Sequence, residues 1–96
     1  MDDLMAFADD LRLDGFAEST VNAYVWRLGV LPFELPGDVR TARSYLASRQ
    51  TSVVNATLIF EIRAMKAYSK WWADEYGEDD RLAALAYPNV AGCRSG

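Results

Sequence analysis

The residues VVNATLIFEIRAMKAYSKWWADEY, numbered 53–76, form the longest and most apolar block of the chain and decide its fold. On a helical wheel of roughly 100° per residue, apolar side chains occupy two faces of this block. The two faces consist of Val54, Leu58, Ile62, Met65, Tyr68 and Trp72, and of Phe60, Ala64, Ala67 and Trp71. A helix that is apolar on so much of its circumference is covered by several neighbours. The block therefore predicts the central helix of an all-α domain.

The rest of this helix is a narrow and mostly polar stripe, which spans about 80° of the wheel. The stripe consists of Asn55, Ile59, Arg63, Lys66 and Lys70. Thr51 and Ser52 are possible capping residues before the helix, and Gly77 is its expected end. Glu61 projects toward the buried side, where we expect it to pair with an arginine rather than to act in catalysis.

Two shorter amphipathic helices are expected before the central one. Residues 3–14 place apolar side chains three and four positions apart, and Gly15 then offers the residue type that ends a helix in the left-handed conformation. Residues 18–31 repeat the pattern and are ended by Pro32, which cannot continue a helix. Both segments therefore predict helices with one buried face.

Two more helices complete the expected series. Asp38 can cap a third short helix, and a last short helix is expected over residues 79–86, with Leu82 and Leu85 returning to the core. No alternating strand pattern of useful length and no internal repeat is found. The sequence thus predicts an all-α fold, a compact bundle of four to five short helices.

The chain has 96 residues, of which 51% are hydrophobic and 25% charged, so it suits one globular domain. We place this domain at residues 1–88 and expect residues 89–96, which follow Pro88, to be a flexible tail or the start of an interdomain linker. The acidic N-terminus and the lack of an apolar run of membrane-spanning length predict a soluble cytoplasmic protein that does not bind membranes.

The composition also excludes several kinds of chemistry. The chain has no histidine, so it cannot build a histidine-dependent catalytic triad or a histidine zinc site. Its single cysteine, Cys93, can form neither an internal disulfide nor a thiolate metal site, and we expect it to be an inert thiol. We expect no catalytic residue, no metal, no cofactor and no small-molecule ligand in this chain.

The net charge of −4 argues at first against a nucleic-acid partner, but the charges are unevenly distributed. Residues 1–18 contain six acids and one arginine, and residues 74–96 contain five acids and two arginines. Residues 39–73 contain six basic residues and one acid, which gives +5. Because salt screens charges beyond about 8–10 Å, a locally basic surface can still bind phosphate.

The order of helices and a set of mostly apolar positions resemble those of a known domain. The matching residues are Phe7 and Leu11; Gly15, Phe16, Thr20, Val21 and Tyr24; Tyr45 and Leu46; and Thr57, Ile62, Ala64, Met65, Lys66 and Tyr68. Over about residues 4–90, the chain resembles the N-terminal core-binding domain, also called SAM-like domain, of tyrosine recombinases, the phage-integrase family. In that family the domain forms half of a clamp around the DNA crossover site, and its second and fourth helices face the duplex.

The chain departs from the family pattern at several places. Ala17 stands where the family usually has a capping serine, and Asp38 stands where it has threonine or serine. Acidic residues and Arg81 replace the family's Asn-Pro before the last helix. The catalytic half, with its arginine, lysine, histidine and nucleophilic tyrosine, is missing, so the resemblance implies that this chain alone is not an enzyme.

The tyrosines of this chain are assigned to the core rather than to catalysis. Tyr24, Tyr45 and Tyr68 fall on apolar faces and are expected to be core or core-rim residues.

Because Met1 directly precedes the first helix, we also expect that no arm-type DNA-binding domain comes before it.

The candidate DNA-binding residues lie on the second and fourth expected helices. They are Ser19, Thr20, Asn22, Arg27, Asn55, Arg63, Lys66 and Lys70. Arginine can make forked contacts with phosphate, lysine acts as a point charge, and hydroxyl or amide groups donate to phosphate or base edges. Two structural alternatives stay open, since the stripe can be a solvated face and Ser19 and Thr20 can be first-turn caps.

Trp26 is a large apolar side chain on the polar face of the second helix, and three explanations stay open for it. It packs under another helix, meets a partner protein, or lies against DNA sugars. The acidic ends should face away from DNA, either as solvated surface or as contacts between protomers.

The resemblance implies a DNA-binding module in a site-specific recombinase of a bacterial or phage-infected cytoplasm. Its partners would be double-stranded DNA with a core-type recombination site and the other protomers of a synaptic tetramer. The alternative is a helical protein-interaction module with a recombinase-like fold and no DNA binding, which the acidic total and Trp26 favour. A free-standing enzyme is the weakest alternative.

Overall fold

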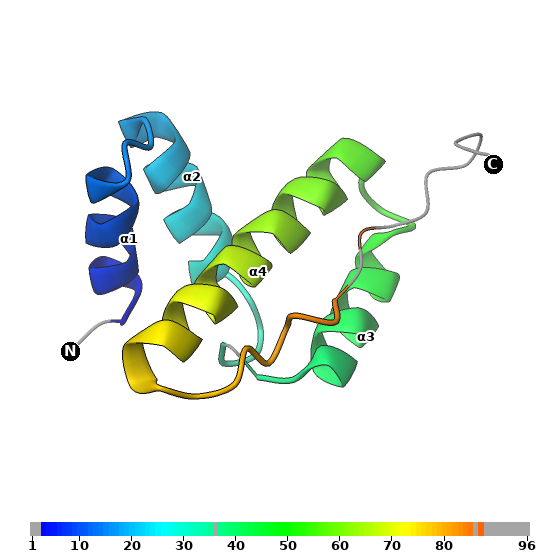
Figure 1. Cartoon of the computed structure of the whole chain (residues 1–96). Helices are drawn as coiled ribbons and strands as arrows, with labels where there is room; N and C mark the ends of the chain where they lie inside the picture. Colours follow the sequence, from blue (N-terminus) through cyan, green and yellow to red (C-terminus); the bar gives the residue numbers. More distant parts are fainter. Residues whose placement is uncertain (1–2, 36, 86, 88–96) are drawn as a thin grey trace, which may run out of the picture.

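The computed structural model describes residues 3–35, 37–85 and 87, and the regular secondary structure of these residues is entirely helical (Figure 1). The helices are α1 (Asp3–Leu13), α2 (Glu18–Gly29), α3 (Val39–Arg49) and α4 (Asn55–Tyr76). The predicted all-α bundle is confirmed. The residues expected to form a tail, 89–96 with Cys93, lie outside the described part of the chain.

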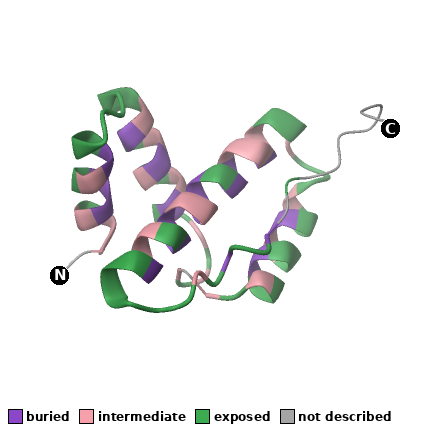
Figure 2. Cartoon of the chain, viewed as in Figure 1, coloured by how far each residue is buried: buried purple, intermediate pink, exposed green. Residues whose placement is uncertain are grey.

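Helix α4 is the centre of the domain, as its apolar sequence predicts. Helix α1 packs against α2, α2 packs against α4, and α3 lies on the other side of α4 (Figure 1). Each helix turns its buried positions inward and its exposed positions outward (Figure 2). On α4 the buried apolar residues are Leu58, Ile62, Ala64, Met65, Tyr68 and Ala73. Burial of these side chains on several sides is the main stabilising contribution to the fold.

Aromatic contacts fasten the outer helices to α4. The ring of Phe7 in α1 meets Tyr68 at 5.3 Å and Trp71 at 5.7 Å, both edge to face. Tyr24 of α2 is 5% exposed, and its ring lies 5.3 Å from that of Phe60. Tyr45 of α3 is half-buried against the core. The core and core-rim positions predicted for the tyrosines are confirmed.

Several helix ends follow the local sequence, but α2 ends at Gly29, before the predicted end at Pro32, and its N-cap residue Ala17 has no capping side chain. Gly15 and Gly77 both take left-handed backbone angles, with φ of 96° and 66°, and the Asp38 side chain accepts a hydrogen bond of 2.7 Å from the backbone N–H of Thr41. These predicted signals are confirmed. At the start of α4, Val54 is the N-cap residue and offers no capping side chain, so the caps predicted at residues 51 and 52 are wrong.

The predicted last helix over residues 79–86 is not formed in its described part, residues 79–85. This segment, called the strap below, runs as turns along α4 (Figure 1). The Leu82 N–H donates to Ser69 Oγ at 3.0 Å and to Asp80 Oδ1 at 3.2 Å, and Ser69 donates to the same Asp80 oxygen at 2.6 Å. Side-chain oxygens thus accept the hydrogen bond of the Leu82 N–H, which in a continuous helix would go to a backbone carbonyl.

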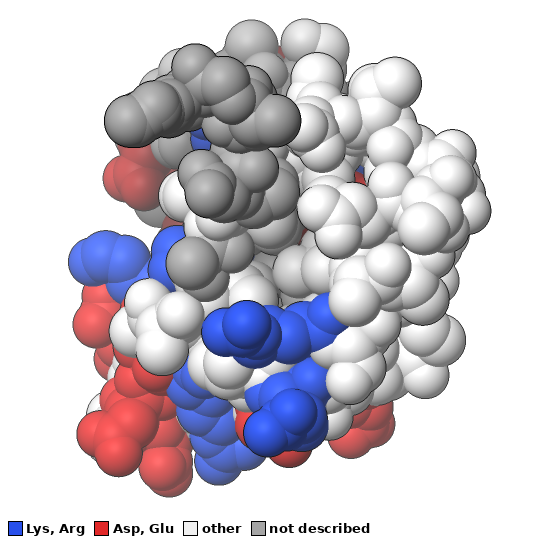
Figure 3. Space-filling model, turned by 90° about the vertical axis from the view of Figure 1, so that its right-hand side faces the viewer, with Lys and Arg blue, Asp and Glu red and all other residues white. Residues whose placement is uncertain are grey.

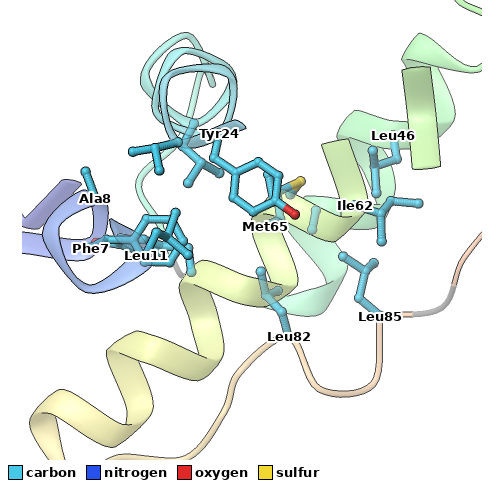
Figure 4. Packing of buried hydrophobic residues seen from close by; sticks show 14 of the residues in the cluster. Phe7, Ala8, Leu11, Tyr24, Leu46, Ile62, Met65, Leu82 and Leu85 are labelled. Carbon is cyan, nitrogen blue, oxygen red and sulfur yellow. The ribbon is translucent and has the colours of Figure 1, made fainter. Parts of the chain in front are cut away.

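The strap nevertheless closes the core, as the sequence pattern predicts. Leu82 is fully buried and Leu85 is 3% exposed. Figure 4 shows Leu82 pointing toward Met65 and Leu85 pointing toward Ile62, so both pack against α4.

Candidate nucleic-acid interface

The outer face of α2 carries three of the predicted DNA-binding residues. Ser19 and Asn22 are exposed, and Thr20 is half-buried. The N-cap position is held by Ala17, which has extended backbone angles and no side-chain capping bond. Within the described residues, neither hydroxyl caps this helix, so the capping role considered for Ser19 and Thr20 is wrong.

Helix α4 presents three further predicted residues, Asn55, Arg63 and Lys70, all of them exposed. Burial raises the pKa of the Tyr24 phenol, and the positive charge of Arg63 partly offsets this rise. The charge of Arg63 is therefore felt at Tyr24 of α2. In the part of the chain that the structure describes, neither Arg63 nor Lys70 forms an ion pair, so both cations are available to phosphate.

Lys66 belongs to the same predicted stripe, but the structure gives it an internal partner. Its ammonium group donates to the backbone carbonyls of Leu82, Ala83 and Leu85 at 3.2, 2.9 and 2.7 Å. Lys66 is half-buried as a result. Its assignment to DNA binding stays a prediction, whereas its contacts make it the residue that holds the strap on α4.

Arg27 is also engaged inside the protein. The carboxylate of Glu61 accepts a bond of 3.1 Å from Arg27 Nη1 and two bonds, 2.9 and 2.6 Å, from Nε and Nη2 of Arg49. The Glu61 side chain is only 4% exposed. The expected pairing of Glu61 with arginine is confirmed, and it joins α2, α3 and α4 at one point.

Trp26 stands on the outer face of α2 and is 61% exposed. The explanation that Trp26 packs under another helix is therefore wrong for the described residues. The Arg27 guanidinium lies over the indole, 5.3 Å from the ring centroid. The other two explanations, a protein partner and DNA sugars, stay as predictions.

Helix α3 adds two basic residues that no predicted site included. Arg40 and Arg43 are both exposed. Figure 3, seen from the α3 side, shows Lys and Arg side chains close together in the lower half of this surface, with acidic side chains at its lower left. The excess of basic residues counted over residues 39–73 includes these two arginines, but the sequence pattern was not used to predict which face of the third helix is exposed.

On the acidic side of the molecule, the positive charge of Arg12 is neutralised by two carboxylates. Arg12 of α1 pairs with Glu18 at 2.9 Å and with Asp9 at 3.0 Å. The hydrogen bond from Arg12 lowers the pKa of the Glu18 carboxyl. At the other end of the chain, the acids of residues 74–79 are exposed. Phosphate would be repelled by both regions.

Two kinds of site are absent from the described residues. There, no group of His, Cys, Asp or Glu side chains is placed to hold a metal ion, and no helix combines the length and apolarity needed to cross a membrane. Comparison with protein-family models, with curated proteins and with solved structures finds no match to this chain. The arrangement of α2, α3 and α4 is therefore the basis for proposing a function.

Proposed function

We propose that this chain is the DNA-binding module of a site-specific tyrosine recombinase of the phage-integrase type. It would hold duplex DNA at the core crossover site without cleaving a strand itself. The observation that carries the proposal is the exposed position of Arg63 and Lys70 on one stripe of α4.

The spatial separation of charge supports this proposal. The exposed polar groups of α2 and the cations of α4 would bind phosphate oxygens, while the acidic ends would face away from the duplex. Because few cations are exposed on this surface, we expect weak binding, in the micromolar range or above, that depends strongly on salt. In the parent recombinase, a catalytic domain and the other protomers of a tetramer would supply further contacts.

The test is a titration of fluorescently labelled duplex DNA at low and moderate salt, read by anisotropy. The double variant Arg63→Gln/Lys70→Gln should bind all duplexes more weakly and lower the slope of log K against log salt by about 1.8, for two phosphates at about 0.9 each. Arg12→Gln/Arg81→Gln is the matched control, because it makes the same change in net charge and should leave the slope almost unchanged. Equal weakening by both double variants would exclude a specific role for the α4 stripe.

A second function is favoured by the exposure of Trp26. An indole that is 61% exposed on a helix surface is typical of a contact with a protein partner. On this alternative, the chain would bind no DNA at low salt and would self-associate with concentration, and Trp26→Ala would abolish that association. Sedimentation velocity of the wild type and this variant distinguishes the alternative from the first proposal.

A further inference from the structure

The junction of α2, α3 and α4 holds more positive charge than its buried carboxylate can neutralise. Two arginines, Arg27 and Arg49, converge on Glu61, and their side chains are 30% and 28% exposed. The carboxylate contributes one negative charge against two positive ones. A residual positive charge therefore sits on two partly buried arginines, where an anion is attracted more strongly than at a fully exposed residue.

The two guanidinium groups also keep unused hydrogen-bond donors. Arg27 uses only Nη1 to reach Glu61, and Arg49 uses Nε and Nη2. Among the described residues, no acceptor is bonded to Nε or Nη2 of Arg27 or to Nη1 of Arg49. Since Arg27 Nη1 and Arg49 Nη2 bond to the same oxygen of Glu61, the two groups lie within two hydrogen-bond lengths of each other.

Neighbouring aromatic side chains restrict both arginines. The Arg27 guanidinium lies over the Trp26 indole at 5.3 Å, and that of Arg49 lies over the Tyr45 ring at 5.7 Å. Burial raises the pKa of the Tyr45 phenol, and the charges at the junction also act on it. Tyr45 therefore flanks the junction through its ring, over which the Arg49 guanidinium lies. Restricted donors lose little conformational entropy when a ligand binds.

We propose that Arg27 and Arg49, held in place by Glu61 and flanked by Tyr45, form a binding site for one phosphate group. A phosphate offers several acceptor oxygens, and the two guanidinium groups that meet at Glu61 keep unused donors that can bond to them. Glu61 leaves the remaining donors free, because it accepts only from Nη1 of Arg27 and from Nε and Nη2 of Arg49. Only the source of the phosphate rests on the proposed function. If that function holds, the phosphate is a phosphodiester of the DNA backbone.

The first test uses inorganic phosphate and needs no DNA. Arginine Nε–Hε signals are recorded by NMR while phosphate replaces chloride at constant ionic strength. The Nε–Hε signals of Arg27 and Arg49 should shift and saturate with a dissociation constant in the millimolar range, while those of Arg12 and Arg81 shift little. If the shifts at Arg27 and Arg49 are no larger than those at Arg12 and Arg81, the proposal is overturned.

A conservative variant tests whether both arginines are needed. Arg27→Lys keeps the charge that neutralises Glu61 but loses the forked donor, so phosphate binding detected at Arg49 should weaken roughly tenfold. Arg43→Lys is the matched control on the exposed surface of α3 and should leave the titration unchanged. Undiminished binding in Arg27→Lys would contradict a two-arginine site. Circular dichroism at 222 nm establishes that both variants are folded.

A DNA titration then distinguishes the source of the phosphate. If a backbone phosphodiester occupies the site, Arg27→Lys should weaken duplex binding, and Arg43→Lys should weaken it less. Loss of phosphate binding with no change in duplex affinity would overturn the DNA assignment and support a site for a free phosphate or a phosphate monoester. Absence of duplex binding by the wild type would contradict the proposed function, while the phosphate titration still decides the site itself.

Discussion

Replacement of Lys66 by methionine tests whether this residue holds the strap. Methionine keeps most of the apolar stem but removes the ammonium group that donates to three strap carbonyls. A hydrogen bond with a charged partner contributes about 1.5–3 kcal/mol. Because the bond to Ala83 is exposed and water can replace part of the other two, we expect Lys66→Met to lower the free energy of unfolding by about 2–3 kcal/mol.

The loss should be visible both globally and at the strap. For a domain of this size, it corresponds to a fall in the thermal midpoint of roughly 10–20 °C. Urea unfolding followed by tryptophan fluorescence measures the free energy, and hydrogen exchange should show faster exchange at the amides of Leu82 and Leu85. Lys70→Met, one turn further along α4 and exposed, is the control and should change stability by less than about 0.5 kcal/mol.

The opposite result would refute the reasoning. If Lys66→Met leaves the urea midpoint and the exchange of the strap amides unchanged, then the three carbonyl contacts do not hold the strap. If the same variant also weakens duplex binding as much as Arg63→Gln does, Lys66 is a phosphate contact, as the resemblance to the recombinase domain implied.

Three further predictions concern the helix ends and the buried charge. Ala17→Ser supplies the missing N-cap of α2 and should stabilise the fold by about 1 kcal/mol in urea unfolding, whereas an unchanged midpoint would contradict the cap geometry. Glu61→Gln leaves two arginines without a countercharge and should lower the free energy of unfolding by about 2–3 kcal/mol. This loss is smaller than that for a fully buried ion pair, because both arginines are partly solvated. No change in the same assay would contradict the role of this network. Hydrogen bonds from Thr41 lower the pKa of Asp38 in the folded state, so its stabilising contribution is present above the unfolded value of about 4 and is lost as the pH falls through the lower folded value. The thermal midpoint of Asp38→Ala should therefore fall less steeply in this acid range than that of the wild type, and parallel curves would contradict the prediction.

The sequence was sufficient for features that depend on local periodicity and on single capping residues. The faces of the helices, the left-handed glycines and the Asp38 cap follow from residues a few positions apart, so they could be predicted. The pairing of Glu61 with arginine could also be predicted, because a carboxylate on a buried face needs a partner. Which two arginines reach it depends on how α2, α3 and α4 pack, and no local pattern contains that information.

The strap shows why the remaining features could not be predicted. Residues 79–85 have a helical pattern of leucines, but a helix this short is marginal without tertiary support. Its backbone groups instead bond to Ser69 and Lys66 on α4, which are more than ten positions away in the sequence. The same contacts explain why Lys66 is on the predicted stripe and yet is occupied internally. Side chains that reach across the fold override both helix propensity and the apparent exposure of a stripe.

The most direct test of the proposed DNA-binding function is to map the duplex-binding surface by NMR at low salt. Backbone amide signals of the uniformly ¹⁵N-labelled chain are followed during titration with a short duplex. The proposal predicts salt-sensitive shifts at the exposed positions of α2 and α4, around Ser19, Asn22, Arg63 and Lys70, and little change on the acidic side around Asp9. No shifts at low salt, or shifts concentrated on the acidic side, would contradict it.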